Sequence, residues 1–261
     1  MSTNRTSLAV GTWAVAVRIL LESWRRRRTL LFWVIFPSLM LLLFGSIYAG
    51  GGRGSRASFD ETAPGILTGA ALFFSCLSGP VSVVVAERER RTLRRVLLAP
   101  VPRLAYPLGV LAAFTVVAAG QTAIVYGIAF LFGGRFHGAI WLGALIVLLS
   151  VACYALLGFV LGARLARRAE DVNGPVSAIG VPLLVLGGTF FPPQFLPPFL
   201  RSANVVNPIF HMNEALRAVW ARGESFDMVA GHVLALVVIA LVFLFLTAHS
   251  YRALLREGNA P

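Results

Sequence analysis

Side chains that could act as nucleophiles or metal ligands are few in this sequence and widely spaced. Ser78, which precedes Gly79, and His232 could form a serine–histidine pair for hydrolysis. No third group that would orient the histidine is evident, and a buried serine beside glycine is more often a close helix contact. We therefore retain a membrane-embedded hydrolase that uses Ser78 and His232 only as an alternative.

The histidines and cysteines also lack the spacing of a metal site. Neither an H-x-x-x-H nor a C-x-x-C pair, which are spacings typical of zinc ligands, occurs in the chain. We predict no metal site and no disulfide. The residues concerned are His137, His211, His232, His249, Cys76 and Cys153.

The chain contains no lysine at all. A Walker A phosphate-binding loop, G-x-x-x-x-G-K-[ST], needs a lysine that reaches the phosphates. Any hydrolysis of ATP, with its Mg²⁺, must therefore take place on another chain, and we expect this one to bind no cofactor.

The composition is that of a membrane protein. The 261 residues are 57% hydrophobic and only 13% charged, with a mean hydropathy of +0.79, whereas soluble domains carry about 25% charged residues. The net charge of +12 comes from arginine. Because the basic residues alternate with apolar segments of bilayer length, we expect contact with the lipid bilayer and none with nucleic acid.

Six segments without Asp, Glu or Arg have the roughly 20 residues that a transmembrane helix needs. They predict an all-α polytopic membrane protein, with the whole of 1–261 as a single transmembrane domain. The absence of carboxylates from the spans disfavours ion-coupled transport, which usually places them there. The fifth span should end near Phe191, where prolines follow. The predicted spans are 30–50, 64–86, 106–132, 139–162, 173–191 and 229–250.

Arginine is distributed unequally between the two ends of these spans. Seventeen of the 23 arginines lie in segments 5–28, 88–103, 164–168 and 252–256, which face one side, and six face the other. Cytoplasmic loops are enriched in arginine and lysine. Both termini are therefore predicted to be cytoplasmic.

The segment before the first span, 8–28, is predicted to be an amphipathic interfacial helix. Its apolar residues fall on one helical face, and an arginine-rich helix with tryptophans suits the membrane surface. Packing on protein is the alternative. The residues of this face are Trp13, Val17, Leu20, Leu21 and Trp24.

Two further segments connect the spans. The loop 87–103 reads as a short charged helix with Leu93, Val96 and Leu97 on one face, ended by proline. This helix either lies on its own membrane domain or docks on a soluble partner. On the other side, 192–226 reads as a proline-rich turn followed by short re-entrant or surface helices.

Two motifs in these segments resemble the ABC-2 type permease family, the membrane subunits of bacterial ABC exporters of the drug-resistance type. The family pattern E-x-E-x-G-T-L-x-x-L-L-x-x-P-V-x-R is met in loop 87–103, where Arg91 replaces the glycine and Val96 a leucine. The matching residues are Glu87, Glu89, Thr92, Leu93, Leu97, Pro100, Val101 and Arg103. A second pattern, F-P-x-x-x-x-P followed by N-P and A-L-R, is met by Phe191-Pro192, Pro197, Asn207-Pro208 and Ala215-Leu216-Arg217.

The resemblance implies a permease subunit of the bacterial inner membrane and not an enzyme. A separate ATPase subunit would power it, and a second permease copy or a paralogue would complete the path for a lipophilic or amphiphilic substrate (a drug, lipid or glycan). A channel and a non-transporting assembly subunit are the remaining alternatives. The ATPase-coupling residues it implies are Glu87, Glu89, Arg91, Thr92, Leu93, Val96, Leu97 and Pro100. For the substrate path we predict Phe73, Phe74, Ser78, Thr189, Phe190 and Phe191 at the seam between two subunits, because pockets combine apolar walls with a few polar groups.

Overall fold

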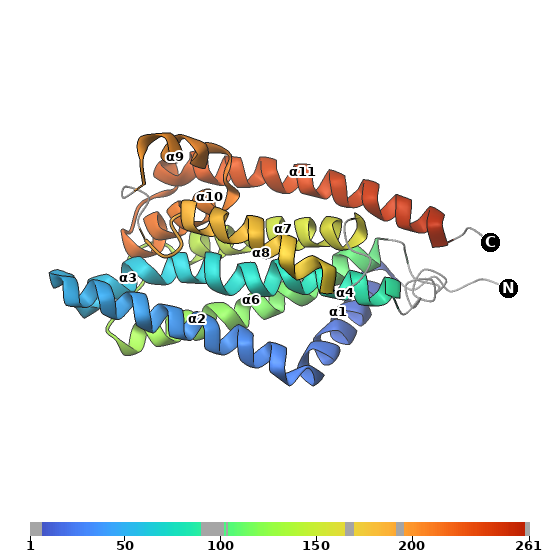
Figure 1. Cartoon of the computed structure of the whole chain (residues 1–261), viewed down its shortest axis with the longest axis horizontal. Coiled ribbons are helices and arrows are strands. Elements are labelled where there is room, and N and C mark those ends of the chain that lie inside the picture. The colour runs from blue at the N-terminus through green and yellow to red at the C-terminus, as the bar shows by residue number, and fades with distance from the viewer. Residues whose placement is uncertain (1–6, 90–101, 103, 165–169, 192–195, 259–261) are drawn as a thin grey trace.

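The protein is a bundle of long helices, in agreement with the predicted all-α class. The computed structural model describes residues 7–89, 102, 104–164, 170–191 and 196–258, and no strand occurs among them (Figure 1). The elements, in chain order, are α1 (Leu8–Arg25), α2 (Arg27–Tyr48), the π-helical segment η1 (Ala49–Arg53), α3 (Ser55–Gly65), the π-helical segment η2 (Ile66–Leu77), α4 (Ser78–Glu89), α6 (Ala105–Leu131), α7 (Ile140–Arg164), α8 (Glu170–Leu186), α9 (Pro198–Ala203), the 3-10 turn η4 (Asn204–Val206), α10 (Pro208–Leu216), the π-helical turn η5 (Arg217–Ala221) and α11 (Phe226–Gly258).

Five helices in the described part of the chain are long and apolar enough to cross a membrane. They are Arg27–Gly52, Ser55–Glu89, Ala105–Leu131, Ile140–Arg164 and Phe226–Leu254. The predicted fifth span corresponds to α8, whose 17 residues extend roughly 26 Å at 1.5 Å per residue. That length is slightly below a hydrocarbon thickness of about 30 Å, so the prediction of six spans rests on α8.

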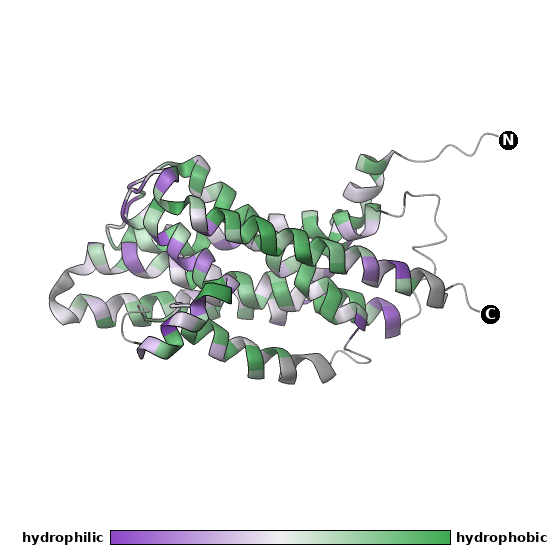
Figure 2. Cartoon of the chain, turned by 90° about the horizontal axis from the view of Figure 1, so that it is seen from above, coloured by the Kyte–Doolittle hydropathy of each residue, from purple (hydrophilic) through white to green (hydrophobic). Residues whose placement is uncertain are grey.

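Both termini lie at the same end of the bundle (Figure 1). We call this the inner end, after the predicted topology, and the opposite end the outer end. Hydrophobic residues follow the length of the bundle, and hydrophilic ones gather toward its ends (Figure 2). This distribution is the one expected of a bundle that spans a bilayer.

The helix of the second span begins earlier than the sequence predicted. Prediction started it at residue 64, because Asp60 and Glu61 precede that position, whereas the structure continues the helix from Ser55 through α3, η2 and α4. The two carboxylates have partners that the sequence could not reveal. Asp60 accepts a hydrogen bond from the backbone N–H of Arg135 at 2.7 Å, and Glu61 is 3.4 Å from Arg217.

The fifth predicted span ends earlier than expected. Prediction placed its end near Phe191, but α8 ends at Leu186, and Gly188 follows with a φ of 77°. A glycine in this left-handed region commonly ends a helix, because it carries no Cβ that would clash. The helix thus stops at a glycine before it reaches the prolines.

Helix α1 uses a different face for packing than the one predicted to be apolar. Gly11, Val15, Ala16 and Ile19 are buried, and α1 packs mainly on α6, where a Cβ built on Gly109 would come within 2.5 Å of Val15. The predicted face remains largely exposed, with Trp13, Leu21 and Trp24 more than half accessible. One face of α1 therefore holds it to the bundle, and the tryptophan face is free for a membrane surface.

Candidate functional site

The base of the predicted coupling loop is joined to α1 by a charged pair. Glu87, near the end of α4, is buried and forms a salt bridge with Arg18 of α1. The buried Tyr106 of α6 lies beside the same carboxylate. The start of the loop is therefore connected directly to the surface helix and to the third span.

Two further arginines bind α4 and α7 to their neighbours at the inner end. Arg88 donates a hydrogen bond to the carbonyl oxygen of Gly162 in α7 at 3.1 Å, and Arg164 donates to the hydroxyl of Ser250 in α11 at 2.8 Å. Together with the Glu87–Arg18 pair, these contacts connect the four helices α1, α4, α7 and α11 at the inner end, next to the end of α4. A displacement of Glu87 or Arg88 would therefore act on all of these helices.

Of the predicted coupling residues, the structure places the first two. Glu87 is buried, as described, and Glu89 is exposed at the end of α4. The remaining ones lie outside the described residues, so their docking role stays a prediction. They are Arg91, Thr92, Leu93, Val96, Leu97 and Pro100.

The outer end contains a buried arginine that sequence reasoning did not select as a site residue. Arg217 is 3% exposed and lies 2.5 Å from Glu214 and 3.4 Å from Glu61. It also donates to the carbonyl oxygen of Gly188 at 3.0 Å. One guanidinium thus connects α3, α10 and the turn after α8, and its fork of donors suits several oxygen partners.

Arg222 supports this network from the surface. It lies 3.5 Å from both Glu61 and Glu214 and 3.7 Å from Glu224, with 44% of its side chain exposed. Partial burial by itself lowers the pKa of Arg222, but the three carboxylates outweigh it and the net effect raises that pKa. Arg222 therefore stays charged at physiological pH.

Three asparagines donate hydrogen bonds to carbonyl groups at the end of α8 and in the turn that follows it. Asn207 donates to Leu183 at 3.0 Å, Asn204 to Leu186 at 2.8 Å and Asn213 to Gly187 at 2.7 Å. The last carbonyls of a helix have no partner within it, and leaving them buried and unbonded is costly. The Asn-Pro and Ala-Leu-Arg motifs therefore serve the same local purpose, which is to end α8 inside the protein.

The same network continues into the second span. Asn213 also contacts the Thr68 hydroxyl and donates to the Thr189 hydroxyl at 3.3 Å. Tyr154 of α7 donates to the Thr68 carbonyl at 3.0 Å. Gly69 allows this close approach, because a Cβ at that position would be 2.2 Å from Thr189.

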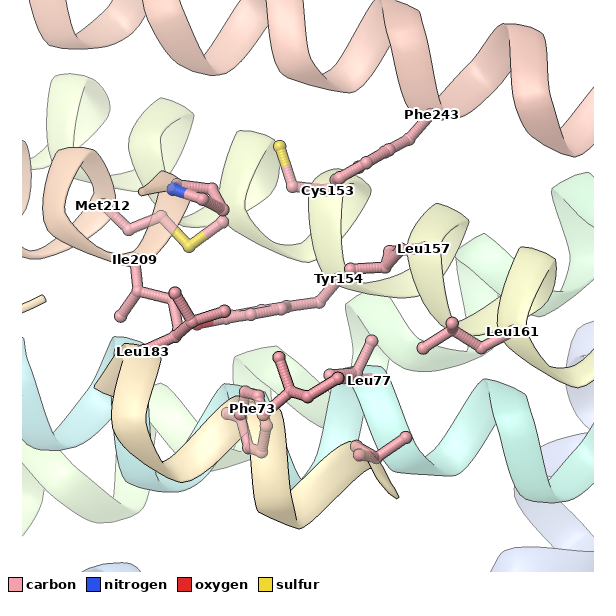
Figure 3. A pocket seen from close by; sticks show the side chains of 14 residues that line it. Phe73, Leu77, Cys153, Tyr154, Leu157, Leu161, Leu183, Ile209, Met212 and Phe243 are labelled. Carbon is pink, nitrogen blue, oxygen red and sulfur yellow. The ribbon is translucent and has the colours of Figure 1, made fainter. Parts of the chain in front are cut away.

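The structure does not bring the six predicted path residues onto one surface. Phe73 is buried within the subunit and points into a cavity formed with α7 and α8 (Figure 3). Thr189 is buried in the network described above. Their position at a seam between two subunits stays a prediction.

The other four predicted path residues are half-buried. The Phe74 ring packs 5.2 Å from Phe36 of α2, and Ser78 accepts a hydrogen bond from the Ser82 hydroxyl through its carbonyl at 2.9 Å. Phe190 stacks on Phe44 at 5.3 Å. Phe191 borders a very small pocket beside Arg217.

The alternative serine–histidine pair is not formed. His232 instead lies 2.9 Å from His211 between their Nδ1 atoms and packs beside the Phe210 ring. Gly79 lies against Phe114, where a Cβ would come within 2.2 Å of the ring. The serine–glycine pair therefore belongs to a close helix contact, which was the competing interpretation.

Comparison with known proteins decides the family. The model of the ABC-2 type transporter family matches residues 11–220, which include both motifs, most of α1 and the elements from α2 to α10. The chain belongs to the ABC-2 type transporter family. This ABC-2 permease is 26% identical over 212 residues to the inner membrane transport permease YadH of Escherichia coli (strain K12), covering 78% of this chain and 79% of the relative.

A second relative comes from Porphyra purpurea. The ABC-2 permease is 25% identical over 217 residues to the putative transport permease ycf38 of Porphyra purpurea, covering 81% of this chain and 74% of the relative. Family membership and five apolar spans identify a multi-pass membrane protein that acts as a transport permease. An enzymatic role for the chain itself receives no support from these relatives.

Proposed function

We propose that this ABC-2 permease is the membrane subunit of an ATP-driven exporter in the bacterial inner membrane. Two permease subunits, identical or paralogous, would form the path, and a separate ATPase would supply the energy. The proposal rests on one observation. The chain belongs to the ABC-2 type transporter family but contains no lysine, and so it has no Walker A loop of its own.

Segment 87–103 is the proposed contact with the ATPase. The segment begins at the inner end of the bundle. The arginine-rich segments are predicted to lie on this side, as expected of the cytoplasmic side. Helix-in-groove binding uses apolar anchors at i, i+3 and i+4, a spacing met by Leu93, Val96 and Leu97. The surrounding arginines would mainly steer the encounter.

The inner-end contacts supply a route for coupling. A push on the loop would act first on Glu87 and Arg88, which contact Arg18 of α1 and the Gly162 carbonyl of α7. Packed helices respond to such a push by shifting from one packing arrangement to another, because a packed interface does not deform continuously. We propose that ATP-driven closure of the ATPase pair reaches the spans through these contacts.

The proposed substrate is lipophilic or amphiphilic. Support comes from the aromatic residues Phe74, Phe190 and Phe191, which are half-buried in the subunit and would be completed by the second subunit. Phe73 and Thr189 would shape the path from behind, and Ser78 would contribute a polar contact. Pockets with mostly apolar walls and few polar groups suit such molecules.

Isolation of the complex tests the proposal. The chain, extracted in mild detergent, should co-purify with an ATP-hydrolysing protein, and vesicles containing both should accumulate a lipophilic dye only with ATP. A chain that purifies alone and passes the dye without ATP would indicate a channel. A stable complex that hydrolyses ATP but moves no dye or lipid would favour the assembly-subunit alternative.

A further inference from the structure

An apolar cavity of about 280 Å³ lies within the subunit, between the second span, α7, α8, α10 and α11 (Figure 3). Its floor is buried and includes Phe73, Cys153, Tyr154 and Met212. Three of its walls belong to helices that are apolar and long enough to cross a membrane. The cavity therefore lies at the depth of the lipid chains.

The polar atoms of the floor are already satisfied. The Tyr154 hydroxyl donates to the Thr68 carbonyl at 3.0 Å, and the Cys153 thiol contacts the Leu236 carbonyl at 3.6 Å. All other side chains of the wall are hydrocarbon or thioether. A ligand would find no free hydrogen-bonding group here, so its buried part must be apolar.

Helix α8 covers the cavity with one face of its middle turns. Val176, Ile179, Gly180 and Leu183 line it, and their i, i+3, i+4 and i+7 spacing defines a single helical face. Among the described residues, α8 packs on α4 and α10, and the backbone of Gly180 lies close to the Phe73 ring. Ile179 is 67% exposed, so the opening lies along the middle of α8.

Size distinguishes the possible occupants. A helix of a second subunit alongside α8, about 10 Å wide and roughly 26 Å long, has a volume on the order of 2,000 Å³. Drug-sized ligands occupy about 300–1,000 Å³ and need a few polar contacts. A cavity of about 280 Å³ without polar groups fits a slender hydrocarbon chain.

An apolar cavity at this depth is not expected to stay empty. Water does not fill it, because buried water needs polar partners, and each lining atom without a neighbour loses dispersion contacts. In a bilayer, lipid chains would lie beside an opening at this depth. We propose that the cavity is a binding site for one acyl chain of a membrane phospholipid, held within the subunit and separate from the proposed seam between subunits.

Photolabelling tests this site. The purified permease is placed in phosphatidylethanolamine–phosphatidylglycerol vesicles with a trace of phosphatidylcholine that carries a diazirine near the end of one acyl chain. After illumination, mass spectrometry should find label on the floor residues Cys153 and Tyr154. Leu148, on the exposed face of the same helix, reports the labelling by bulk lipid.

Cavity-filling variants supply the control. Val176→Trp fills the cavity and should remove the floor label, whereas Val181→Trp, on the exposed side of α8, should leave it unchanged. Leu157→Trp and Leu148→Trp form a second pair in α7, which protects the test if one variant fails to fold. Floor label no stronger than at Leu148, or unchanged label in both filled variants, would overturn the proposal. No ATPase or ATP is present, so the result does not depend on the proposed export function.

Discussion

At the scale of single residues, Arg217 is a buried arginine at the outer end with several hydrogen-bonding partners. Its guanidinium is buried and contacts two carboxylates and the Gly188 carbonyl. A surface ion pair contributes little to stability, but removing one partner of a buried pair leaves the other uncompensated. The role of Arg217 is therefore structural, and it acts on the turn that ends α8.

We predict that Arg217→Gln destabilises the protein by about 2–3 kcal/mol, at the low end for a broken buried pair because Glu61 is partly exposed. Arg222→Gln is the matched control, since it contacts the same carboxylates from the surface, and it should cost less than about 1 kcal/mol. Thermal unfolding in detergent measures both. Equal losses of stability in the two variants would show that the burial of Arg217 does not decide its contribution to stability.

At the scale of elements, the second span packs closely on the turn after α8. A Cβ on Gly69 would come within 2.2 Å of Thr189, and one on Gly65 within 2.6 Å of the Thr189 carbonyl. Such small-residue contacts let helices approach closely in a membrane. The position of α8 relative to the second span depends on them.

Gly69→Ala should therefore destabilise the protein by about 1–3 kcal/mol through overpacking. Gly127→Ala is the control, because nothing lies within 4 Å of its Cβ position. It should be neutral or stabilise by up to about 1 kcal/mol through helix propensity. Unfolding temperatures of the two variants in the same detergent decide the matter, and a neutral Gly69→Ala would contradict the close contact.

Sequence reasoning succeeded where a single physical requirement dominates. Runs of about 20 apolar residues can hardly be anything but spans, so the helical class and five spans were predictable. It failed where distant residues decide. The helical extension through Asp60 and Glu61 depends on Arg135 and Arg217, and the early end of α8 depends on Gly188 with three asparagines from the next helices.

The candidate site was predictable only in part, for the same reason. The Asn-Pro and Ala-Leu-Arg motifs marked the outer segment. The sequence did not show that Asn207 and Arg217 each donate a hydrogen bond to a carbonyl group at or just after the end of α8. Phe73 points into a cavity within one subunit (Figure 3), and its place at a seam between subunits stays a prediction. Its chemistry was readable from the sequence, but the direction of its side chain was not.

At the scale of the whole molecule, the bundle has two chemically different ends. Both termini lie at the inner end (Figure 1), and the arginine distribution predicts that this end is cytoplasmic. Helix α1 lies toward this end (Figure 1), and its exposed Trp13 and Trp24 suit the membrane surface. These features together predict the orientation in the membrane.

Cysteine labelling tests this orientation. Ser55→Cys and Ser225→Cys, exposed at the outer end, should react with a membrane-impermeant maleimide added to intact cells. Ala253→Cys, exposed at the inner end, should react only after permeabilisation. The native Cys76 and Cys153 are buried and should give little background, and the reversed pattern would overturn the assignment.

The central claim is that a separate ATPase drives this permease through segment 87–103, and the double variant Leu93→Asp/Leu97→Asp tests it most directly. Charges placed on the apolar anchors would be buried unpaired in the contact, at a cost of several kcal/mol. Leu93→Met/Leu97→Met keeps the anchors apolar and similar in volume and is the control. We predict that the Asp variant inserts normally but loses the ATPase on purification and loses ATP-dependent transport, while the Met variant keeps both. Full ATPase association and transport in the Asp variant would contradict the account.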